Sequence, residues 1–144
     1  MIVLGEGERK KELKELCNKL NLNDKVMFLG HVNNNYEFIK NSVCVLVTSL
    51  WEDPGFVMIE AAALKKPVIV SNCPNGPKEF FTDKQKSFLF KNNSVDSLVK
   101  TFNKFKKTKK NQLDNIIKQN YTNSKKYSEK YHGIKLIKLL NEKE

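Results

Sequence analysis

Two glutamates on one short segment are the residues of this chain best suited to bind a ligand. Glu52 and Glu60 are separated by seven residues, and Pro54-Gly55 lies between them. An ionised carboxylate only accepts hydrogen bonds, and each can take two hydroxyl groups. The alanines that follow Glu60 predict tight packing there, where a carboxylate without a partner would be costly. This spacing therefore predicts a ligand that carries several hydroxyls.

The same segment predicts an anion site. The apolar run 43–48 precedes it and is typical of a strand, whereas residues 56–64 have the composition of a helix. The first amides of a helix have no partner within the helix and carry a partial positive charge, so they attract phosphate. Gly55 would let the backbone approach the ligand closely. Hydroxyl acceptors beside a phosphate site predict a nucleotide sugar.

The segments that must position this loop alternate between strand and helix patterns. Strands are expected at 1–4, 26–29, 43–48, 67–71 and 88–90, and helices at 8–20, 36–40, 56–64 and from 78 onward. This order predicts an α/β fold, a Rossmann-like parallel sheet with helices on both faces. Ligands of such sheets bind at the carboxyl ends of the strands. The loops 5–8, 30–35, 49–55 and 72–77 are therefore the candidates for ligand contact.

The chain changes character after Ser94, which is a plausible N-cap. We expect a Rossmann-like nucleotide-sugar-binding domain over 1–94 and a helical, lysine-rich tail over 95–144 that packs on it. Within the tail, residues 104–110 are expected to form a solvated basic stretch, with further helices at 113–119 and 124–140.

Positive charge is concentrated in that tail. The net charge is +10; residues 1–94 contribute +2 and residues 95–144 contribute +8, and Arg9 is the only arginine. Three roles are open for the lysines of the tail: they can form solvated helix faces, attract the protein to an anionic membrane, or bind nucleic acid. Proteins that read nucleic acid favour arginine for contacts to guanine. We therefore expect no nucleic-acid partner and treat a basic nucleic-acid-binding module as the least favoured alternative.

Several classes of protein are excluded by composition. No apolar run approaches the roughly 18 residues that a membrane-spanning helix needs. The three cysteines and two histidines contain no C-x-x-C pair, which argues against a disulfide framework or a zinc site. We therefore predict no metal site and no cofactor. The reducing cytosol fits this cysteine usage best. We therefore expect a cytoplasmic protein, with peripheral contact of the protein at the inner face of the membrane as a further expectation.

Residues 1–90 resemble the C-terminal, donor-binding domain of the family 4 retaining glycosyltransferases, which have the GT-B fold. The matching pieces, in chain order, are Val3-Leu4-Gly5-Glu6-Gly7, residues 26–32, the E-x7-E segment 49–60, residues 67–71 and Gly76-Pro77-Lys78-Glu79. The helical tail is also similar to the end of that family. The resemblance implies metal-independent transfer of a sugar with retention at the anomeric carbon.

The resemblance also implies roles for individual residues. Glu52 would be the catalytic-site residue that contacts the hydroxyls of the donor sugar, and Glu60 would hold the ribose. The other donor contacts would be the backbone amides of Gly55, Phe56 and Val57 and the base-side loop Gly30, His31 and Val32. The donor would be a UDP-, GDP- or ADP-sugar, and the acceptor a hydroxyl group in glycan or surface-polysaccharide assembly.

The resemblance does not extend to every part of the enzymes in this family. That family's domain begins one strand and helix earlier and is preceded by an acceptor-binding domain, and neither has a counterpart here. We therefore expect a partial enzyme that is inactive alone and meets a glycan or lipid-linked acceptor through a missing N-terminal domain. The alternative is a non-catalytic remnant or partner subunit of such an enzyme.

Overall fold

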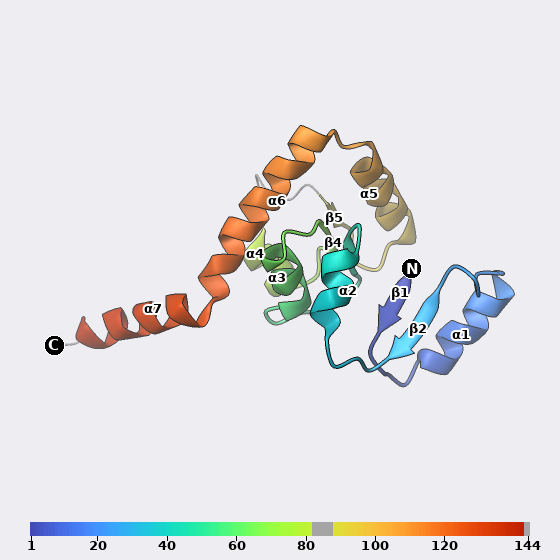
Figure 1. Cartoon of the computed structure of the whole chain (residues 1–144), viewed down its shortest axis with the longest axis horizontal. Helices are drawn as coiled ribbons and strands as arrows, with labels where there is room; N and C mark the ends of the chain where they lie inside the picture. Colours follow the sequence, from blue (N-terminus) through green and yellow to red (C-terminus); the bar gives the residue numbers. More distant parts are fainter. Residues whose placement is uncertain (82–87, 143–144) are drawn as a thin grey trace. The chain divides into compact units, whose positions relative to one another are not determined.

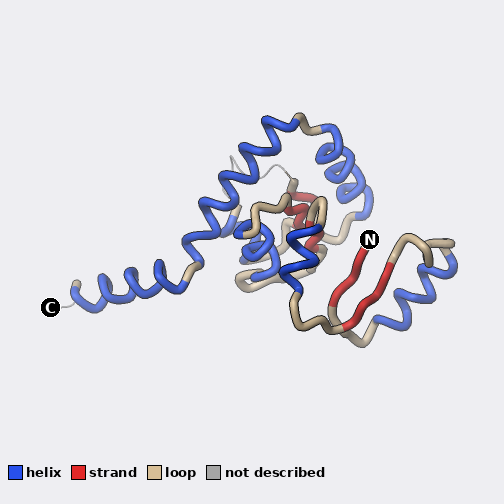
Figure 2. Tube along the Cα trace, viewed as in Figure 1, coloured by secondary structure: helices blue, strands red, loops and turns tan. Residues whose placement is uncertain are grey.

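The computed structural model describes residues 1–81 and 88–142, and it contains short parallel strands joined by helices (Figures 1 and 2). Contacts along the chain divide it into unit 1, Met1–Phe38, and unit 2, Ile39–Glu144. The predicted boundary at residue 94 stays a prediction. The strands are β1 (Ile2–Leu4), β2 (Met27–Gly30), β3 (Val45–Val47), β4 (Val68–Ser71) and β5 (Leu89–Phe90). The helices are α1 (Lys10–Lys19), α2 (Asn35–Asn41), α3 (Phe56–Ala63), α4 (Gly76–Phe80), α5 (Val95–Lys107), α6 (Lys110–Ser124), the 3-10 turn η1 (Lys125–Tyr127) and α7 (Glu129–Asn141).

Unit 1 is a β–α–β unit with little interior. β1 pairs in parallel with β2, and α1 lies between them in the chain. None of the residues of α1 is buried, and Gly30 is the one buried residue of the fully described range 1–38. Its stability therefore depends on backbone pairing and surface contacts more than on a packed core.

The core of unit 2 lies on both faces of β4, the central strand of the parallel sheet β3-β4-β5. All four residues of β4 are buried. Because alternate side chains of a strand point to opposite faces, Val68 and Val70 join one apolar cluster and Ile69 joins another. The first cluster includes Met58, Ile59 and two alanines of α3, and the second includes Phe105 of α5.

This arrangement confirms the predicted fold class, although the described strands form two sheets, β1-β2 and β3-β4-β5, rather than one. Helices cover both faces of the larger sheet, as expected. α6 packs against α3, as Figure 1 shows within unit 2.

The tail departs from prediction in two places. The basic stretch expected at 104–110 is largely helical, since α5 continues to Lys107. Phe105 provides the reason: it is buried in the second cluster, while the neighbouring lysines face solvent. The last helix begins at Glu129, not at Ser124, because the 3-10 turn intervenes and Ser128 caps the new helix by accepting a hydrogen bond from the Tyr131 amide at 3.3 Å.

Candidate functional site

Glu52 is held in place at the carboxyl end of the larger sheet. It lies on the loop that follows β3, and its Oε1 accepts a hydrogen bond of 2.6 Å from the Ser49 hydroxyl. The Ser49 carbonyl in turn accepts a hydrogen bond of 2.5 Å from the hydroxyl of Ser71, the last residue of β4. This chain of contacts connects the carboxylate to the most buried strand of unit 2. Glu52 is half-buried, so one side of the group remains open.

The loop of Glu52 is also fixed by the loop that follows β4. Glu52 and Asn75 form an isolated parallel bridge, and the Gly76 amide donates to the Glu52 carbonyl at 3.3 Å. Gly76 approaches so closely that a Cβ placed on it would lie 2.1 Å from the Pro54 carbonyl oxygen. Only glycine fits there. The two loops therefore form one connected surface at this end of the sheet.

A glycine turns the chain from this loop into α3. Gly55 has φ +84°, a left-handed conformation that favours glycine, and a Cβ there would meet Oε2 of Glu52 at 3.3 Å. Its carbonyl accepts hydrogen bonds from the amides of Met58 and Ile59 at 3.2 and 3.4 Å. Phe56 and Val57 follow as the first helical residues, whose amides have no carbonyl partner within a helix. The binding of an anion by these amides stays a prediction.

Glu60 lies on the open face of α3. The buried residues of this helix are Met58, Ile59, Ala61 and Ala62, so Glu60 falls on the opposite side and is half-buried. Ala61 and Ala62 belong to the buried stripe, whereas Ala63 is exposed. The tight packing expected around Glu60 stays a prediction. Phe56 precedes Glu60 by one helical turn on the same face, a rise of about 6 Å. Helical side chains lean toward the N-terminus, so Glu60 leans toward the start of α3.

Four apolar side chains surround the start of α3 without being buried. Trp51 is 59% exposed and Phe56 is 63% exposed, and Leu50 and Val57 are also exposed. Exposed apolar residues beside polar groups are typical of surfaces that bind a ligand.

The other predicted contact loop, Gly30-His31-Val32, belongs to unit 1. Gly30 has φ +73° and its carbonyl accepts a hydrogen bond of 2.7 Å from the Gly5 amide. A Cβ on Gly30 would meet the Glu6 carboxylate at 2.4 Å. His31 is exposed and Val32 is half-buried. Since the two units are described separately, the joining of this loop with Glu52 and Glu60 in one site stays a prediction.

The electrostatics of the Gly5–Gly30 turn centre on Glu6. Its carboxylate accepts hydrogen bonds of 2.7 and 2.9 Å from the Lys10 ammonium. The hydrogen bond from Lys10 is the main reason that the pKa of Glu6 lies below its ordinary value; desolvation opposes it, and the charge of Lys10 and a backbone hydrogen bond from His31 add to the lowering. The glycine turn is therefore closed by an ion pair that touches the predicted base-side loop.

Sequence reasoning missed the residues that support Glu52. In the sequence, Ser49 and Ser71 stand out only as parts of longer segments, and Asn92 only as part of the boundary before Ser94. Asn92 follows β5, and its Nδ2 donates to the Leu50 carbonyl at 2.9 Å, which fixes the start of the loop. The signal for Ser49 was available in its position three residues before Glu52, a spacing at which a hydroxyl can reach across a turn.

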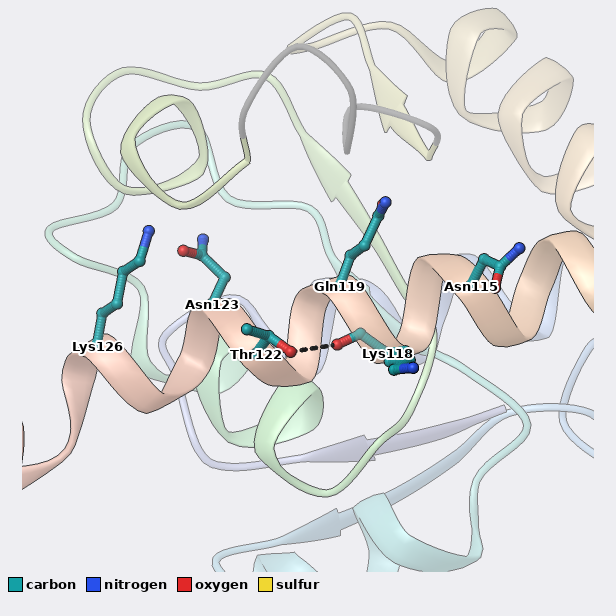
Figure 3. Close-up of a pocket in the computed structure, with 6 residues that line it drawn as sticks. All are labelled: Asn115, Lys118, Gln119, Thr122, Asn123 and Lys126. Atoms are coloured by element: carbon teal, nitrogen blue, oxygen red, sulfur yellow. Dashed lines mark hydrogen bonds between the residues drawn. The ribbon is translucent and has the colours of Figure 1, made fainter.

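One hollow in the described part of the chain lies away from Glu52 and Glu60. It has a volume of about 440 Å³ and is lined by six residues of the α6–η1 segment, drawn in Figure 3. Two of these side chains already form hydrogen bonds within the protein. The Thr122 hydroxyl donates to the Lys118 carbonyl at 3.0 Å, and the Asn123 side-chain amide donates to the Phe80 carbonyl. None of the predicted site residues lines this hollow.

Within residues 1–81 and 88–142, no three histidine, cysteine, aspartate or glutamate side chains gather as metal ligands would. In the same ranges, no helix has the length and apolar character needed to cross a bilayer.

Comparisons with known proteins agree on one family. The family described as glycosyl transferases group 1 matches residues 1–123. An uncharacterized glycosyltransferase of Methanocaldococcus jannaschii is 47% identical over 79 residues, which cover 55% of this chain and 20% of the relative. N-acetylgalactosamine-N,N'-diacetylbacillosaminyl-diphospho-undecaprenol 4-alpha-N-acetylgalactosaminyltransferase of Campylobacter jejuni is 32% identical over 98 residues, covering 68% of this chain and 27% of the relative.

A solved structure agrees with these relatives. A mutant of TarM from S. aureus, in complex with fondaparinux, alpha-GlcNAc-glycerol and UDP, has a TM-score of 0.76 and 26% identity. The match covers 97% of this chain and 28% of TarM. The chain thus spans between a fifth and three tenths of the length of these proteins. These matches confirm the GT-B fold class and the resemblance noted in the sequence.

Proposed function

The chain belongs to the glycosyl transferases group 1 family, and from this premise we propose that it forms the nucleotide-sugar donor site of a retaining glycosyltransferase. The enzyme would transfer a sugar to a hydroxyl acceptor in glycan or surface-polysaccharide assembly. The observation that carries this proposal is the placement of Glu52, which Ser49 and Ser71 tie to the end of the sheet just before α3 begins.

Each part of this surface suits one part of the donor. The amides of Gly55, Phe56 and Val57 would hold the diphosphate, because the start of a helix favours anions. Glu52 would accept hydrogen bonds from the sugar hydroxyls. Glu60, on the open face one turn further along, would accept those of the ribose. The Gly30-His31-Val32 loop would lie against the base.

The chemistry that we propose needs no metal ion from the protein. As the bond from the anomeric carbon to the diphosphate breaks, negative charge develops on the departing phosphate oxygens. Amides fixed at the start of α3 would stabilise that charge without reorganisation. The acceptor hydroxyl would bond to the anomeric carbon on the same face and pass its proton to the departing phosphate oxygen, which gives retention. Positioning of the two substrates supplies the remaining rate enhancement.

Two of the similar proteins support the identity of the substrates. The TarM structure contains UDP, so we favour a UDP-sugar over a GDP- or ADP-sugar as donor. The name of the Campylobacter jejuni relative includes a diphospho-undecaprenol acceptor, which supports a lipid-linked glycan as acceptor. Because the chain spans only part of each protein, the acceptor would be bound with the help of residues outside this chain.

An amide NMR titration of the full chain with UDP, GDP and ADP tests the proposal. We expect shifts at Gly30–Val32 and at Glu52–Glu60 with UDP, and weaker or no shifts with the other two nucleotides. Glu60→Gln should reduce the affinity for UDP about tenfold, since a hydrogen bond to a charged group contributes about 1.5–3 kcal/mol. Glu129→Gln, on α7, is the matched control and should leave the affinity unchanged. A well-folded chain that shows no shifts with any nucleotide would contradict the donor site.

A further inference from the structure

The Glu52 carboxylate lies against the residue from which α3 begins. Its Oε1 accepts the hydrogen bond of 2.6 Å from Ser49, and its Oε2 is 3.3 Å from the position that a Cβ on Gly55 would take. Gly55 is the N-cap of α3. A negative group in this position is stabilised by the partial positive charge at the start of a helix. The carboxylate and the diphosphate of a bound donor would therefore share one source of positive potential.

The side chains around Glu52 add negative charge and not positive charge. Residues 49–64 contain three acids and no lysine or arginine, although the whole chain has a net charge of +10. The acids are Glu52, Asp53 and Glu60. The contacting loop 72–77 has no charged residue, and the lysines that border the neighbouring loops, Lys78 and Lys91, are exposed, so solvent and salt screen them. An anion at the start of α3 would be held by backbone amides and opposed by side-chain charge.

A sugar donor and its product differ in charge as well as in size. The diphosphate of a UDP-sugar carries two negative charges. When the bond between the anomeric carbon and the phosphate oxygen breaks, the bonding electrons stay on that oxygen, which takes the proton of the acceptor hydroxyl. A terminal phosphate has a second pKa of about 6, so at neutral pH UDP passes this proton to water and gains nearly one further charge. A nearby carboxylate therefore repels the product more strongly than the donor.

We infer that Glu52 distinguishes the donor from the product, because its negative charge weakens the binding of the nucleoside diphosphate once the sugar has been transferred. The inference rests on the proposed function, since it needs the diphosphate at the start of α3. To the binding of sugar hydroxyls it adds a role in product release, a step that limits the rate of many enzymes. Two like charges about 6 Å apart change a dissociation constant about threefold even at the dielectric constant of water, and more at a half-buried site.

Isothermal titration of the full chain and of Glu52→Gln tests this role. The two ligands are UDP and UDP methylated on its terminal phosphate. The methyl ester has the charge of a UDP-sugar but no sugar hydroxyls, so the comparison isolates charge. Glutamine keeps the size of the side chain and an oxygen that can accept the hydrogen bond from Ser49. We expect Glu52→Gln to bind UDP at least about threefold more tightly, with a smaller gain for the methyl ester.

Asp53→Asn is the matched control, because it removes the same charge from the neighbouring residue. Asp53 is exposed, so we expect it to change the affinity for UDP less than about twofold. Circular dichroism of each variant reports whether it folds. If Glu52→Gln does not fold, the unmodified chain still tests the inference: it should bind the methyl ester more tightly than UDP, and the reverse order would contradict a repulsive carboxylate.

The outcomes separate this inference from the proposed function. Weaker binding of UDP by a folded Glu52→Gln, or an equal change for both ligands, would overturn the inference and leave the donor site in place. Equal tightening by Glu52→Gln and Asp53→Asn would overturn it as well, because the effect would then be one of general charge. Absence of UDP binding by the well-folded unmodified chain would contradict the proposed function itself, and the inference with it.

Discussion

At the scale of single residues, the Ser49 hydroxyl sets the direction of the Glu52 carboxylate, because it donates to Oε1 at 2.6 Å. Ser49→Ala should therefore weaken the binding of a UDP-sugar about five- to tenfold, while the affinity for UDP alone, which lacks the sugar hydroxyls, stays nearly constant. Isothermal titration with both ligands measures the difference. Ser42→Ala, which removes a hydroxyl that donates to the Ile39 carbonyl away from the site, is the control. Equal weakening for both ligands would contradict a role at the sugar.

The second residue-scale prediction concerns the ion pair of Glu6 and Lys10. Because the folded state holds the pKa of Glu6 below its ordinary value, the pair contributes stability that is present above the unfolded pKa and is lost as the pH falls through the folded pKa. Lys10→Gln should return the pKa of Glu6 toward its ordinary value. Carboxyl-detected NMR titration measures the change. Glu12, whose pKa is lowered by Arg9, should not move, and movement of both would point to a wider rearrangement of α1.

At the scale of elements, α5 depends on its N-cap. The Ser94 hydroxyl accepts a hydrogen bond from the Ser97 amide at 3.3 Å, and this helix supplies Phe105 to the second apolar cluster. Ser94→Ala should lower the free energy of unfolding of unit 2 by about 1 kcal/mol. Unfolding by denaturant measures this change in the free energy of unfolding. Ser94→Asp keeps an acceptor at the cap and should restore most of the loss; equal destabilisation by both changes would show that packing, not capping, matters at this position.

Elements were predictable where a single strong signal determined them. The apolar run of β4, the alanine-rich α3 and the cap at Ser94 each lie within a residue or two of the expected bounds. The extension of α5 was not predictable from its lysines, because burial of Phe105 is a tertiary effect that outweighs local polarity. The candidate site shows the same difference between local and tertiary signals. The E-x7-E spacing identifies Glu52 and Glu60 as candidates. The hydrogen bonds of Ser71 to Ser49 and of Asn92 to Leu50 could not be predicted, because each joins residues more than twenty positions apart.

At the scale of the whole molecule, the two units differ in how many of their residues are buried. Unit 2 has two apolar clusters, whereas Gly30 is the one buried residue of the range 1–38. Amides of β2 should therefore exchange with deuterium much faster than those of β4, because local opening needs less free energy where little apolar surface is buried. Exchange measured by mass spectrometry checks this, with β1 expected to follow β2. Equal protection of β2 and β4 would mean that the chain opens as one cooperative body.

The short length of the outer strands has a consequence for handling the protein at high concentration. The strands at the edges of the two sheets are β1, β2, β3 and β5, with three, four, three and two residues. Their side chains include exposed apolar groups such as Ile2, Met27 and Leu46, which would favour stacking of copies into fibrils. Edges this short present few unpaired amides to a neighbouring copy, and short edges are a common protection against aggregation. Lengthening β3 by favouring strand structure at its exposed Val43 end would remove that protection and lower the solubility of the chain.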